Sequence, residues 1–505
     1  MMAQDLEAQP MTPLSQLLAG IVEVPHEVKV SDITLDSRTA SRDGLFLAVR
    51  GLRSHGLEYL DRALAAGIRA VVWEPGPGVV APVVPATVIS LAVPDLGRQL
   101  GRIADRFFEA PSAQLRIAGV TGTNGKTTSC WILAQALDAL GLRAGYSGTL
   151  GFGPVTALKP STHTTPDCIS VHRQLSDLHA MGLRYLGMEV SSHALAQDRV
   201  DAVRFDTAIF TNLTRDHLDF HRTMDAYALA KAQLFAFPTL EHRVINMGDA
   251  MGRRIAQSLP SSQLVTAFWC GVGEYREACD SYVQGRCVRA GSAGLDIEFD
   301  SSWGGGVLRS RLIGEFNAEN LIAMLAVLLL WDAPLAEAAR ALEAASAPAG
   351  RMETFRGAAD QPVAVVDYAH SPDSLGKALR AARKHCRGRL WCVFGCGGDR
   401  DPGKRAMMGA IAAQLADEIV LTDDNPRTED PARIIEQIAS GIDTDVPVRT
   451  IPARAVAIAT ALSEAGSADI VVIAGKGHEE QQIYGTVAHP FSDRAEVARI
   501  LGVRG

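Results

Sequence analysis

The sequence predicts an α/β protein of three domains built on mostly parallel sheets. The chain has 505 residues, and a domain usually contains roughly 100 to 200 residues. Short apolar runs alternate with helix-like segments over most of its length, a pattern typical of parallel sheets covered by helices. Stretches rich in proline or small residues interrupt this alternation twice. We therefore expect domains at residues 1–97, 98–346 and 347–505.

The two expected domain boundaries have different compositions. Residues 71–95 contain several prolines with short β-branched runs between them, which indicates strands and turns that close the first domain. A helix-like stretch follows and leads into the second domain. The second boundary is the small-residue segment AASAPAG at 344–350, a typical linker composition.

Eight apolar runs predict the strands of the second and third domains. They are Leu115–Val120, Tyr185–Val190, Thr207–Leu213, Arg243–Met247, Val363–Val366, Leu390–Phe394, Glu418–Leu421 and Asp469–Ile473. Unusual polar residues come directly after these strands. Open parallel sheets bind ligands at the carboxyl ends of their strands, so we expect the functional residues there.

Composition indicates a globular enzyme of the cytoplasm. The chain is 47% apolar and 21% charged, and its net charge of -8 argues against a broad nucleic-acid-binding surface. Its eight cysteines form no CxxC pair, so we expect reduced thiols and neither a zinc site nor a disulfide framework. The start MMAQDLEAQP lacks a signal-peptide pattern, and the apolar run 321–331 is too short to span a bilayer. We expect a monomer.

A glycine-rich loop predicts ATP binding. The run GVTGTNGKTT at 119–128 follows an apolar strand and precedes a helix-like segment, so main-chain N–H groups and the helix N-terminus can bind phosphate. Val120 stands where the generic GxxxxGK[ST] pattern has glycine. The alternative is a glycine-rich turn with a surface lysine. The expected nucleotide-binding residues of the loop are Gly122, Thr123, Asn124, Gly125, Lys126, Thr127 and Thr128.

Further motifs distinguish a ligase from a kinase, a motor or a transporter subunit. In order they are GTNGKTT (122–128), TTPD (164–167), EVSSHAL (189–195), TNLTRDHLDFH (211–221), KAQLF (231–235), GEFNAEN (314–320), GRME (350–353), DYAHSPDS (367–374), GCGGDRDPGKR (395–405), DDNPR (423–427) and GKGHE (475–479). This series resembles the Mur ligases through the whole of the second and third domains. The resemblance implies a uridine-nucleotide-binding first domain, a central ATP-binding domain and a third domain that binds an amino acid.

The resemblance also implies a reaction and its metal ions. ATP phosphorylates a substrate carboxylate, and the amine of the incoming amino acid attacks the acyl phosphate to form an amide. Two Mg²⁺ ions are expected, because two polyanions must approach each other. The residues expected to act in catalysis are Lys126, Glu189, His217 and Lys231. Among these, Glu189, His217 and Lys231 are also expected metal ligands, together with Thr127.

The roles of His217 and Lys231 rest on the resemblance. A histidine in this position could equally be a capping or core residue, and a lone lysine in a helix-like stretch is usually solvated. In the family the matching lysine is carbamylated to N6-carboxylysine, an anion that helps to hold the second Mg²⁺. That reaction requires the neutral amine and hence a depressed pKa.

Four further residues match nucleotide-binding positions of the family. Asn317 and Asn320 can present two amides from one helix face, although helix capping competes as an explanation for Asn317. Arg351 and Asp367, with His370 nearby, match residues that the third domain brings to the nucleotide when it closes. Closure would exclude water from the acyl phosphate.

The substrate residues are also carried over from the family. Ser37, in TLDSR at 34–38, matches the segment that holds the uridine nucleotide in the diaminopimelate- and lysine-adding members. Those matching contacts to the UDP-muramoyl peptide in the diaminopimelate-adding branch are Thr164, Thr165, Ser191, Gln197 and Arg199. Those expected to bind the amino acid are Arg400, Asp424, Asn425, Pro426, Arg427, Gly475 and Glu479. meso-Diaminopimelate carries a distal carboxylate and amine, which Arg427 and Glu479 can pair. Asp167 of TTPD could instead be a helix cap.

Three alternatives stay open at this point. The same reaction with L-lysine would leave Arg427 unpaired, a penalty that favours diaminopimelate. Folylpolyglutamate synthases share a similar loop but normally lack the first domain and the DNPR motif. A regulatory protein that keeps the fold without chemistry would have lost residues such as Lys126 or Glu189. One departure from the family pattern is Gly248, where an acidic residue is usual, so the role of Asp249 is uncertain.

Overall fold

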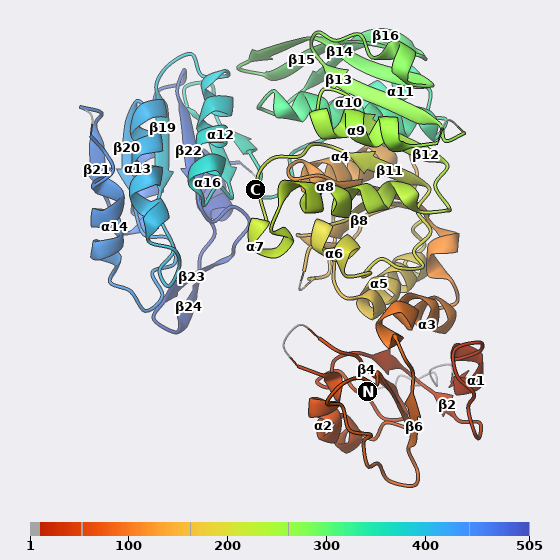
Figure 1. Ribbon diagram of the computed structural model, residues 1–505. Coiled ribbons are helices and arrows are strands. Elements are labelled where there is room, and N and C mark those ends of the chain that lie inside the picture. Colours follow the sequence, from red (N-terminus) through yellow and green to blue (C-terminus); the bar gives the residue numbers. More distant parts are fainter. Residues whose placement is uncertain (1–10, 52–53, 162, 261, 444, 504–505) are drawn as a thin grey trace, which may run out of the picture. The chain divides into compact units, whose positions relative to one another are not determined.

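The computed structural model describes residues 11–51, 54–161, 163–260, 262–443 and 445–503 (Figure 1). The start of the chain, whose pattern argued against a signal peptide, lies outside these ranges. The chain divides into two compact units, one made of residues 1–123, 142–209 and 213–243 and the other of residues 124–141, 210–212 and 244–505. Among the described residues, no helix is long and apolar enough to cross a membrane.

The first unit begins with a small parallel sheet. Its strand order is β3-β4-β5-β6, and the elements here are β1 (Thr12–Pro13), α1 (Leu14–Leu17), β2 (Lys29–Val30), β3 (Ile33–Thr34), β4 (Leu45–Ala48), α2 (Leu60–Ala65), β5 (Ala70–Trp73), β6 (Ile89–Ala92) and α3 (Leu100–Phe107). Along β4, Leu45 and Leu47 pack toward α1 and α3, whereas Phe46 packs toward α2. Because successive side chains of a strand point to opposite faces, both faces of this sheet are buried.

The same unit contains the strands that carry the phosphate loop. Strand β10 pairs in parallel with both β7 and β8, and β9 is antiparallel to β8. The elements are β7 (Arg116–Thr121), β8 (Ala144–Gly148), β9 (Gly151–Gly153), α5 (Cys168–Ala180), β10 (Tyr185–Glu189), α6 (Ser192–Ala196), β11 (Thr207–Phe210), α7 (Leu218–His221) and α8 (Met224–Ala232). Glu189 ends β10 opposite Val120, so the carboxyl ends of two neighbouring strands present the loop and this carboxylate.

The second unit starts with helix α4 and continues with strands and helices from residue 244, within β12. Its elements up to residue 343 are α4 (Lys126–Ala139), β12 (His242–Asn246), α9 (Ala250–Ser258), β13 (Val265–Cys270), β14 (Ser281–Gly291), β15 (Gly294–Ser301), β16 (Gly304–Ser310), α10 (Phe316–Leu330) and α11 (Leu335–Glu343). From Leu321 onward helix α10 is apolar on all sides, and the helix is almost wholly buried, as expected of a core helix.

Strands β14, β15 and β16 form an antiparallel meander that the sequence analysis did not predict. β13 and β14 are parallel, but β14 pairs antiparallel with β15, and β15 with β16. Only two residues separate β14 from β15, and a turn that short can join only antiparallel strands. The glycines near each turn were the available signal for hairpins.

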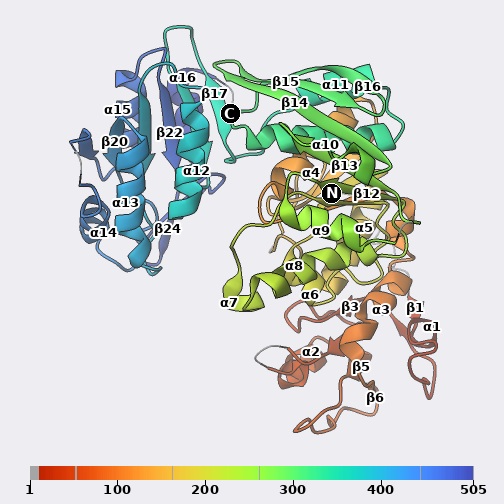
Figure 2. The same ribbon diagram turned by 45° about the horizontal axis from the view of Figure 1, so that its top comes forward.

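The rest of the second unit is a six-stranded sheet between two layers of helices (Figures 1 and 2). The strand order is β17-β18-β22-β19-β20-β21, and only β17 runs antiparallel to its neighbour among these strands. The elements are β17 (Glu353–Arg356), β18 (Val363–Asp367), α12 (Pro372–Arg383), β19 (Leu390–Phe394), α13 (Gly403–Leu415), β20 (Glu418–Leu421), α14 (Pro431–Ala439), β21 (Val448–Thr450), α15 (Arg454–Glu464), β22 (Ile470–Ala474), β23 (Gln481–Tyr484), β24 (Val487–Pro490) and α16 (Asp493–Leu501). Helices α12, α13 and α14 pack on one face, and α15 and α16 on the other.

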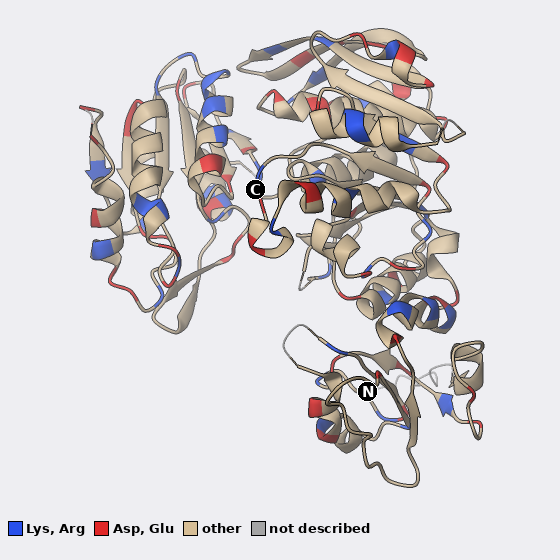
Figure 3. Cartoon of the chain, viewed as in Figure 1, with Lys and Arg blue, Asp and Glu red and all other residues tan. Residues whose placement is uncertain are grey.

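The predicted fold class is confirmed, and most predicted strands are observed. Residues 390–394 and 418–421 form β19 and β20 with the predicted bounds, and the other predicted strands overlap observed ones. Residues 344–350 lie in the connection between α11 and β17. The boundaries at residues 97 and 346 stay predictions. Figure 3 shows acidic and basic residues interspersed along the chain.

Candidate active site

The first part of the phosphate loop lies against α8 and the loop before α7. The carbonyl oxygen of Gly122 accepts a hydrogen bond of 2.7 Å from Lys231 Nζ. Thr123 Oγ1 shares a hydrogen bond of 3.1 Å with the Tyr227 hydroxyl and contacts the carbonyl of Thr214 at 3.2 Å. The start of the loop is therefore held by side chains from a distant part of the sequence.

The second part of the loop enters helix α4. Gly125 has a left-handed φ of 89°, and a Cβ atom there would lie 2.5 Å from Asn320 Oδ1, so glycine is required. Asn124 donates its main-chain N–H to Asn212 Oδ1 at 3.0 Å. Lys126 and the two threonines after it lie in the first turn of the 14-residue helix α4, where main-chain N–H groups and the helix dipole favour phosphate.

Glu189 is a buried carboxylate at the end of β10. It is 1% exposed, and its Oε1 atom accepts the Thr149 N–H at 2.9 Å and a short hydrogen bond from the Tyr146 hydroxyl. Thr149 Oγ1 contacts Oε2 at 3.3 Å. A Cβ atom on Gly148 would lie 2.2 Å from Oε1, so the Glu189 carboxylate can occupy this position only because residue 148 has no side chain.

The substrate residues predicted around Glu189 form one hydrogen-bonded group. Thr165 Oγ1 donates to the Glu189 carbonyl at 2.9 Å and accepts the Ser191 N–H at 3.2 Å. Arg199 Nη1 donates to the Thr165 carbonyl at 3.0 Å, and Arg199 Nη2 donates to Gln197 Oε1 at 2.6 Å. Burial lowers the pKa of Arg199, so this half-buried cation favours an anionic partner.

Thr164 extends the same group, and Asp167 has a structural role. Thr164 Oγ1 lies 3.0 Å from Thr149 Oγ1, the hydroxyl that also contacts Glu189. Asp167 accepts the Ser170 N–H at 3.1 Å and caps helix α5. The capping explanation for Asp167 therefore holds in the structure.

Lys231 is not a solvated helix lysine. Its side chain is 1% exposed, and Nζ lies 4.5 Å from the centroid of the Tyr227 ring in addition to its hydrogen bond with the Gly122 carbonyl. Helix α8 therefore aims this amine at the phosphate loop. The expectation that a lone lysine in a helix-like stretch is solvated is therefore wrong for Lys231, as the family resemblance implied.

His217 lies in a cluster of three histidines. Its ring centroid is 4.9 Å from that of His193, which is 5.4 Å from His221. His217 takes the N-cap position of α7 with a left-handed φ of 52° but makes no side-chain cap bond, and its side chain is 46% exposed. It is therefore neither a capping nor a core histidine. Burial lowers the pKa of both His193 and His221.

Asn317 and Asn320 are buried at the start of α10. Asn320 Nδ2 donates to Asn317 Oδ1 at 2.9 Å, and Asn320 Oδ1 accepts from Ser129 Oγ at 3.3 Å. Asn317 Nδ2 donates to the Ile313 carbonyl at 2.8 Å. Because Asn317 donates to a carbonyl instead of accepting from helix N–H groups, it is not an N-cap. The pair links α10 to the first turn of α4.

Arg351 and Asp367 lie close together in the third predicted domain. The Asp367 carboxylate accepts the Met352 N–H at 2.7 Å, and Arg351 stacks over the Tyr368 ring at 4.9 Å. Burial raises the pKa of Asp367, although the Met352 N–H and the Arg351 charge oppose this rise. Arg351 Nε is buried and donates to no group of the described residues. His370 is exposed.

The loops predicted to bind the amino acid meet at the carboxyl ends of β20 and β22. Asn425 Nδ2 donates to Glu479 Oε2 at 2.9 Å, and Lys476 Nζ contacts both Asn425 Oδ1 and Glu479 Oε2 at 3.1 Å. Arg427 Nη1 donates to the Gly398 carbonyl at 2.7 Å. Asp424 and Asn425 are buried, so this segment is not a charged surface loop.

The remaining predicted residues surround the same place. Gly475 has a left-handed φ of 120° and approaches Asp424 so closely that a Cβ atom would lie 2.5 Å from Oδ2. Pro426 is buried, and its carbonyl lies against Gly398. Arg400 is exposed and makes no ion pair within the described ranges.

In the first unit, Ser37 is 8% exposed and follows β3.

Several site residues were not singled out from the sequence. Lys476 is fully buried and fixes Glu479 and Asn425, and its place in the GKGHE motif was the available signal. Tyr146 and Thr149, which bind Glu189, carry no local signal. The uncertain Asp249 is the N-cap of α9 and accepts the Met251 N–H at 2.7 Å, so its role is structural.

Comparison with protein families gives three consecutive matches. Residues 29–108 match the Mur ligase family catalytic domain, residues 120–328 the Mur ligase middle domain, and residues 350–477 the Mur ligase glutamate ligase domain. Together these matches cover most of the chain.

Individual relatives give longer matches. A protein of Ectopseudomonas mendocina named UDP-N-acetylmuramoyl-L-alanyl-D-glutamate--2,6-diaminopimelate ligase is 46% identical over 489 residues, which is 97% of this chain and 98% of that protein. A Pseudomonas aeruginosa protein of the same name is 46% identical over 480 residues, 95% and 96% of the two chains. A solved structure of an enzyme of this name aligns with a TM-score of 0.73 at 33% identity, covering 98% and 99%. Folylpolyglutamate synthase of Mycobacterium tuberculosis shares the fold, with a TM-score of 0.57 at 18% identity over 81% of this chain and 95% of that one.

Proposed function

The chain belongs to the Mur ligase family, and we propose that it joins meso-2,6-diaminopimelate to UDP-N-acetylmuramoyl-L-alanyl-D-glutamate in peptidoglycan precursor synthesis. The observation that carries this proposal is the 46% identity to a ligase of that name over 97% of the chain. ATP is converted to ADP and phosphate as the amide forms. The substrates are small molecules, and a monomeric enzyme acting in the cytoplasm stays a prediction from the sequence.

The reaction runs through an acyl phosphate. A carboxylate oxygen of the muramoyl peptide attacks the γ-phosphorus of ATP, and ADP leaves. The amine of diaminopimelate then attacks the acyl carbon, phosphate leaves, and the amine loses a proton. Lys126 and the N–H groups at the start of α4 offset the phosphate charge.

Four residues would hold the two Mg²⁺ ions of the family. The Oε1 atom of Glu189 accepts hydrogen bonds from an N–H and a hydroxyl, which fix the orientation of its carboxyl group. Such an oxygen donor suits a hard cation, as does the hydroxyl of Thr127, and His217 matches the family's second metal ligand. The ions would offset charge between the triphosphate and the substrate carboxylate.

We assign the fourth ligand to a carbamate on Lys231. The lysine ammonium first loses a proton, the neutral amine adds to the carbon of CO₂, and a second proton leaves to solvent, so a cation becomes an anion. The near-complete burial of Lys231 supports this assignment, because burial disfavours the charged form of an amine and carbamate formation requires the neutral form.

Specificity for diaminopimelate is assigned to Arg427 and Glu479. Glu479 Oε2 is engaged by Lys476 and Asn425, which leaves Oε1 for the distal ammonium of the amino acid. Arg427 uses Nη1 on the Gly398 carbonyl and keeps further N–H groups for the distal carboxylate. L-Lysine lacks that carboxylate, so it would leave the arginine unpaired.

Oxygen-18 transfer tests the acyl phosphate directly. The muramoyl peptide is labelled in its reacting carboxylate, and the released phosphate is examined by mass spectrometry. One labelled oxygen per phosphate is expected for each amide formed. Unlabelled phosphate would contradict the proposed route.

A further inference from the structure

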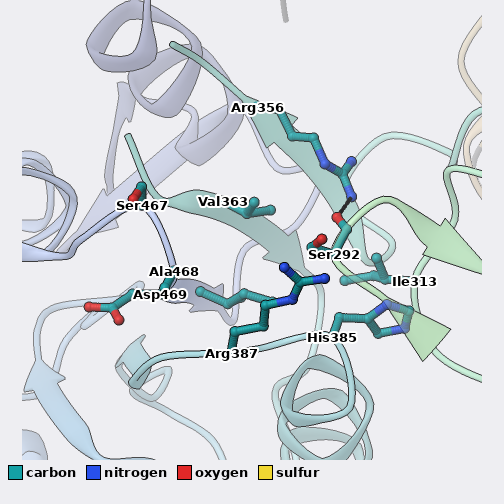
Figure 4. A pocket seen from close by; sticks show the side chains of 10 residues that line it. Ser292, Ile313, Arg356, Val363, His385, Arg387, Ser467, Ala468 and Asp469 are labelled. Carbon is teal, nitrogen blue, oxygen red and sulfur yellow. Dashed lines mark hydrogen bonds between the residues drawn. The ribbon is translucent and has the colours of Figure 1, made fainter. Parts of the chain in front are cut away.

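A cavity of about 270 Å³ lies in the second unit near the end of α12, and none of the residues that line it is one assigned above (Figure 4). The residues that line it include Ser292 from the β14–β15 turn and Ile313 from the segment before α10. Arg356 at the end of β17 and Arg387 after α12 line it as well. The cavity therefore joins the region matched by the Mur ligase middle domain to the region matched by the glutamate ligase domain.

Arg356 is a half-buried cation without an anionic partner. Its Nη2 atom donates to the Ser292 carbonyl at 3.1 Å and its Nη1 atom to Thr354 Oγ1 at 3.2 Å. Within the described part of the chain it forms no ion pair. Burial lowers its pKa, and the nearby charge of Arg311 lowers it further. Two neutral oxygens therefore hold a guanidinium that lacks a counter-charge.

Arg387 adds a second cation to the same wall. Figure 4 shows its side chain in the cavity together with Arg356 and His385. It is exposed and makes neither a hydrogen bond nor an ion pair with any described residue. Arg389, two residues later, is different, because it pairs with Glu418 at 2.8 Å. The cavity is thus lined by two arginines, Arg356 and Arg387, that form no ion pair with any described residue.

The other ionisable groups of the cavity offset only part of the charge of the two arginines, because Asp469 is the one carboxylate among the lining residues. Asp469 lines the cavity, but its Oδ1 accepts the Arg389 N–H at 2.7 Å, and its Oδ2 accepts from Trp391 Nε1 at 3.2 Å and the Gly466 N–H at 3.0 Å. His385 Nε2 accepts a main-chain N–H, so its ring is neutral. The net charge of the cavity wall is therefore positive.

We propose that this cavity binds a small phosphate-like dianion between Arg356 and Arg387. Guanidinium groups offer paired N–H donors that match phosphate oxygens, and Ser292 and Ser467 add polar groups at the rim. The volume lies just below the roughly 300 Å³ at which pockets for drug-sized ligands begin, so the ligand is small. Inorganic phosphate and the phosphate of a small phosphomonoester share this chemistry.

The site would add contacts across the junction between the two matched regions. Ile313 lines the cavity and also accepts the hydrogen bond from Asn317, a residue predicted to bind nucleotide. A bound anion would therefore favour one arrangement of the segment that leads into α10. The inference does not depend on which amino acid the ligase adds.

Binding of phosphate to the full chain, with ADP and Mg²⁺ present to occupy the phosphate loop, tests the inference. Isothermal titration at constant ionic strength would compare wild type with Arg356→Gln and Arg387→Gln. Arg289→Gln is the matched control, because Arg289 is exposed and already paired with Glu298 at 2.9 Å. We expect at least ~10-fold weaker phosphate binding in the first two variants and none of this loss in the control.

Two further arms keep the outcome decisive. Lys126→Ala should leave this binding unchanged, whereas a loss there would assign the phosphate to the phosphate loop and overturn the inference. Titration with glycerol phosphate distinguishes a phosphomonoester from free phosphate as the preferred ligand. Arg387 is exposed, so its variant should fold even if Arg356→Gln does not. Equal phosphate affinity in wild type and Arg387→Gln, or no saturable binding, would contradict the proposal.

Discussion

Nε2 of the buried His385 accepts a hydrogen bond of 2.9 Å from the main-chain N–H of Gly314. The ring proton must therefore lie on Nδ1, which donates to the Gly291 carbonyl at 2.7 Å. The Gly314 carbonyl in turn accepts the Asn317 N–H at 2.8 Å. One neutral imidazole after α12 thus holds both the β14–β15 turn and the segment that leads into the asparagine pair.

Replacing His385 by phenylalanine should destabilise the protein. The Gly314 N–H and the Gly291 carbonyl would lose their partner, and each buried polar group left unpaired costs about 1–3 kcal/mol. Glutamine can both accept and donate, so His385→Gln should retain more of the stability. Urea unfolding measures both variants. Equal free energies of unfolding in the two variants would contradict this role.

Protonation of His385 should contribute to the pH dependence of the free energy of unfolding. Burial lowers its pKa in the folded state, so the folded protein binds this proton less readily than the unfolded chain. Its contribution is fully present above the unfolded value of about 6.5 and is lost as pH falls toward the folded pKa. Unfolding at pH 7.5 and 5.5 should therefore show a larger loss in wild type than in His385→Gln. Parallel losses would count against the assignment.

Gly148→Ala should reduce catalysis more than stability. The new methyl group would displace the Glu189 carboxylate, and a shift of about 1 Å in a reacting group can cost about 100-fold in rate. We expect kcat/KM to fall about 100-fold. Gly97→Ala is the control, because a Cβ atom there meets nothing within 4 Å. Unchanged kcat/KM in Gly148→Ala would show that the position of Glu189 is not critical.

Lys231→Ala should lose at least about 100-fold in kcat, as expected when a metal-site group is removed. Lys159→Ala tests for general effects of losing a lysine, because Lys159 is exposed and pairs with Asp177 at 3.5 Å. If a carbamate forms, wild-type activity should also fall in CO₂-free buffer and return with bicarbonate. Near-normal activity of Lys231→Ala would rule the carbamate out.

Arg427→Ala should weaken selection of diaminopimelate. Loss of one charge-assisted pair predicts about a 10- to 100-fold rise in KM for meso-diaminopimelate with little change for L-lysine. Arg449→Ala is the control, since Arg449 pairs with Glu464 at 2.5 Å on the surface. A KM for meso-diaminopimelate that matches wild type would remove Arg427 from the specificity argument.

The alternation of apolar runs predicted the parallel sheets because buried strands need continuous apolar residues. The runs at 390–394 and 418–421 became β19 and β20 with the predicted bounds. The meander of β14, β15 and β16 was missed because its strands alternate polar with apolar residues around short glycine turns, whereas the predicted strands are continuous apolar runs. Sheet register and helix placement depend on contacts between residues far apart in the sequence, so local sequence patterns do not predict them.

The site was predictable where residues belong to motifs and unpredictable where packing places them. Lys231 looked like an ordinary helix lysine, and only the fold shows that it is buried against the phosphate loop. Tyr146 and Thr149 bind Glu189 from a neighbouring strand and the turn after it. Partners of this kind arise from strand order, which no short sequence pattern encodes.

Phosphate release from ATP by the purified chain tests the central claim most directly. The assay contains UDP-N-acetylmuramoyl-L-alanyl-D-glutamate with meso-diaminopimelate, with L-lysine or with no amino acid, and the product mass is determined. We predict turnover with meso-diaminopimelate alone and a product heavier by that residue. Equal turnover with L-lysine would contradict the specificity, and no turnover with either amino acid would contradict the proposed function.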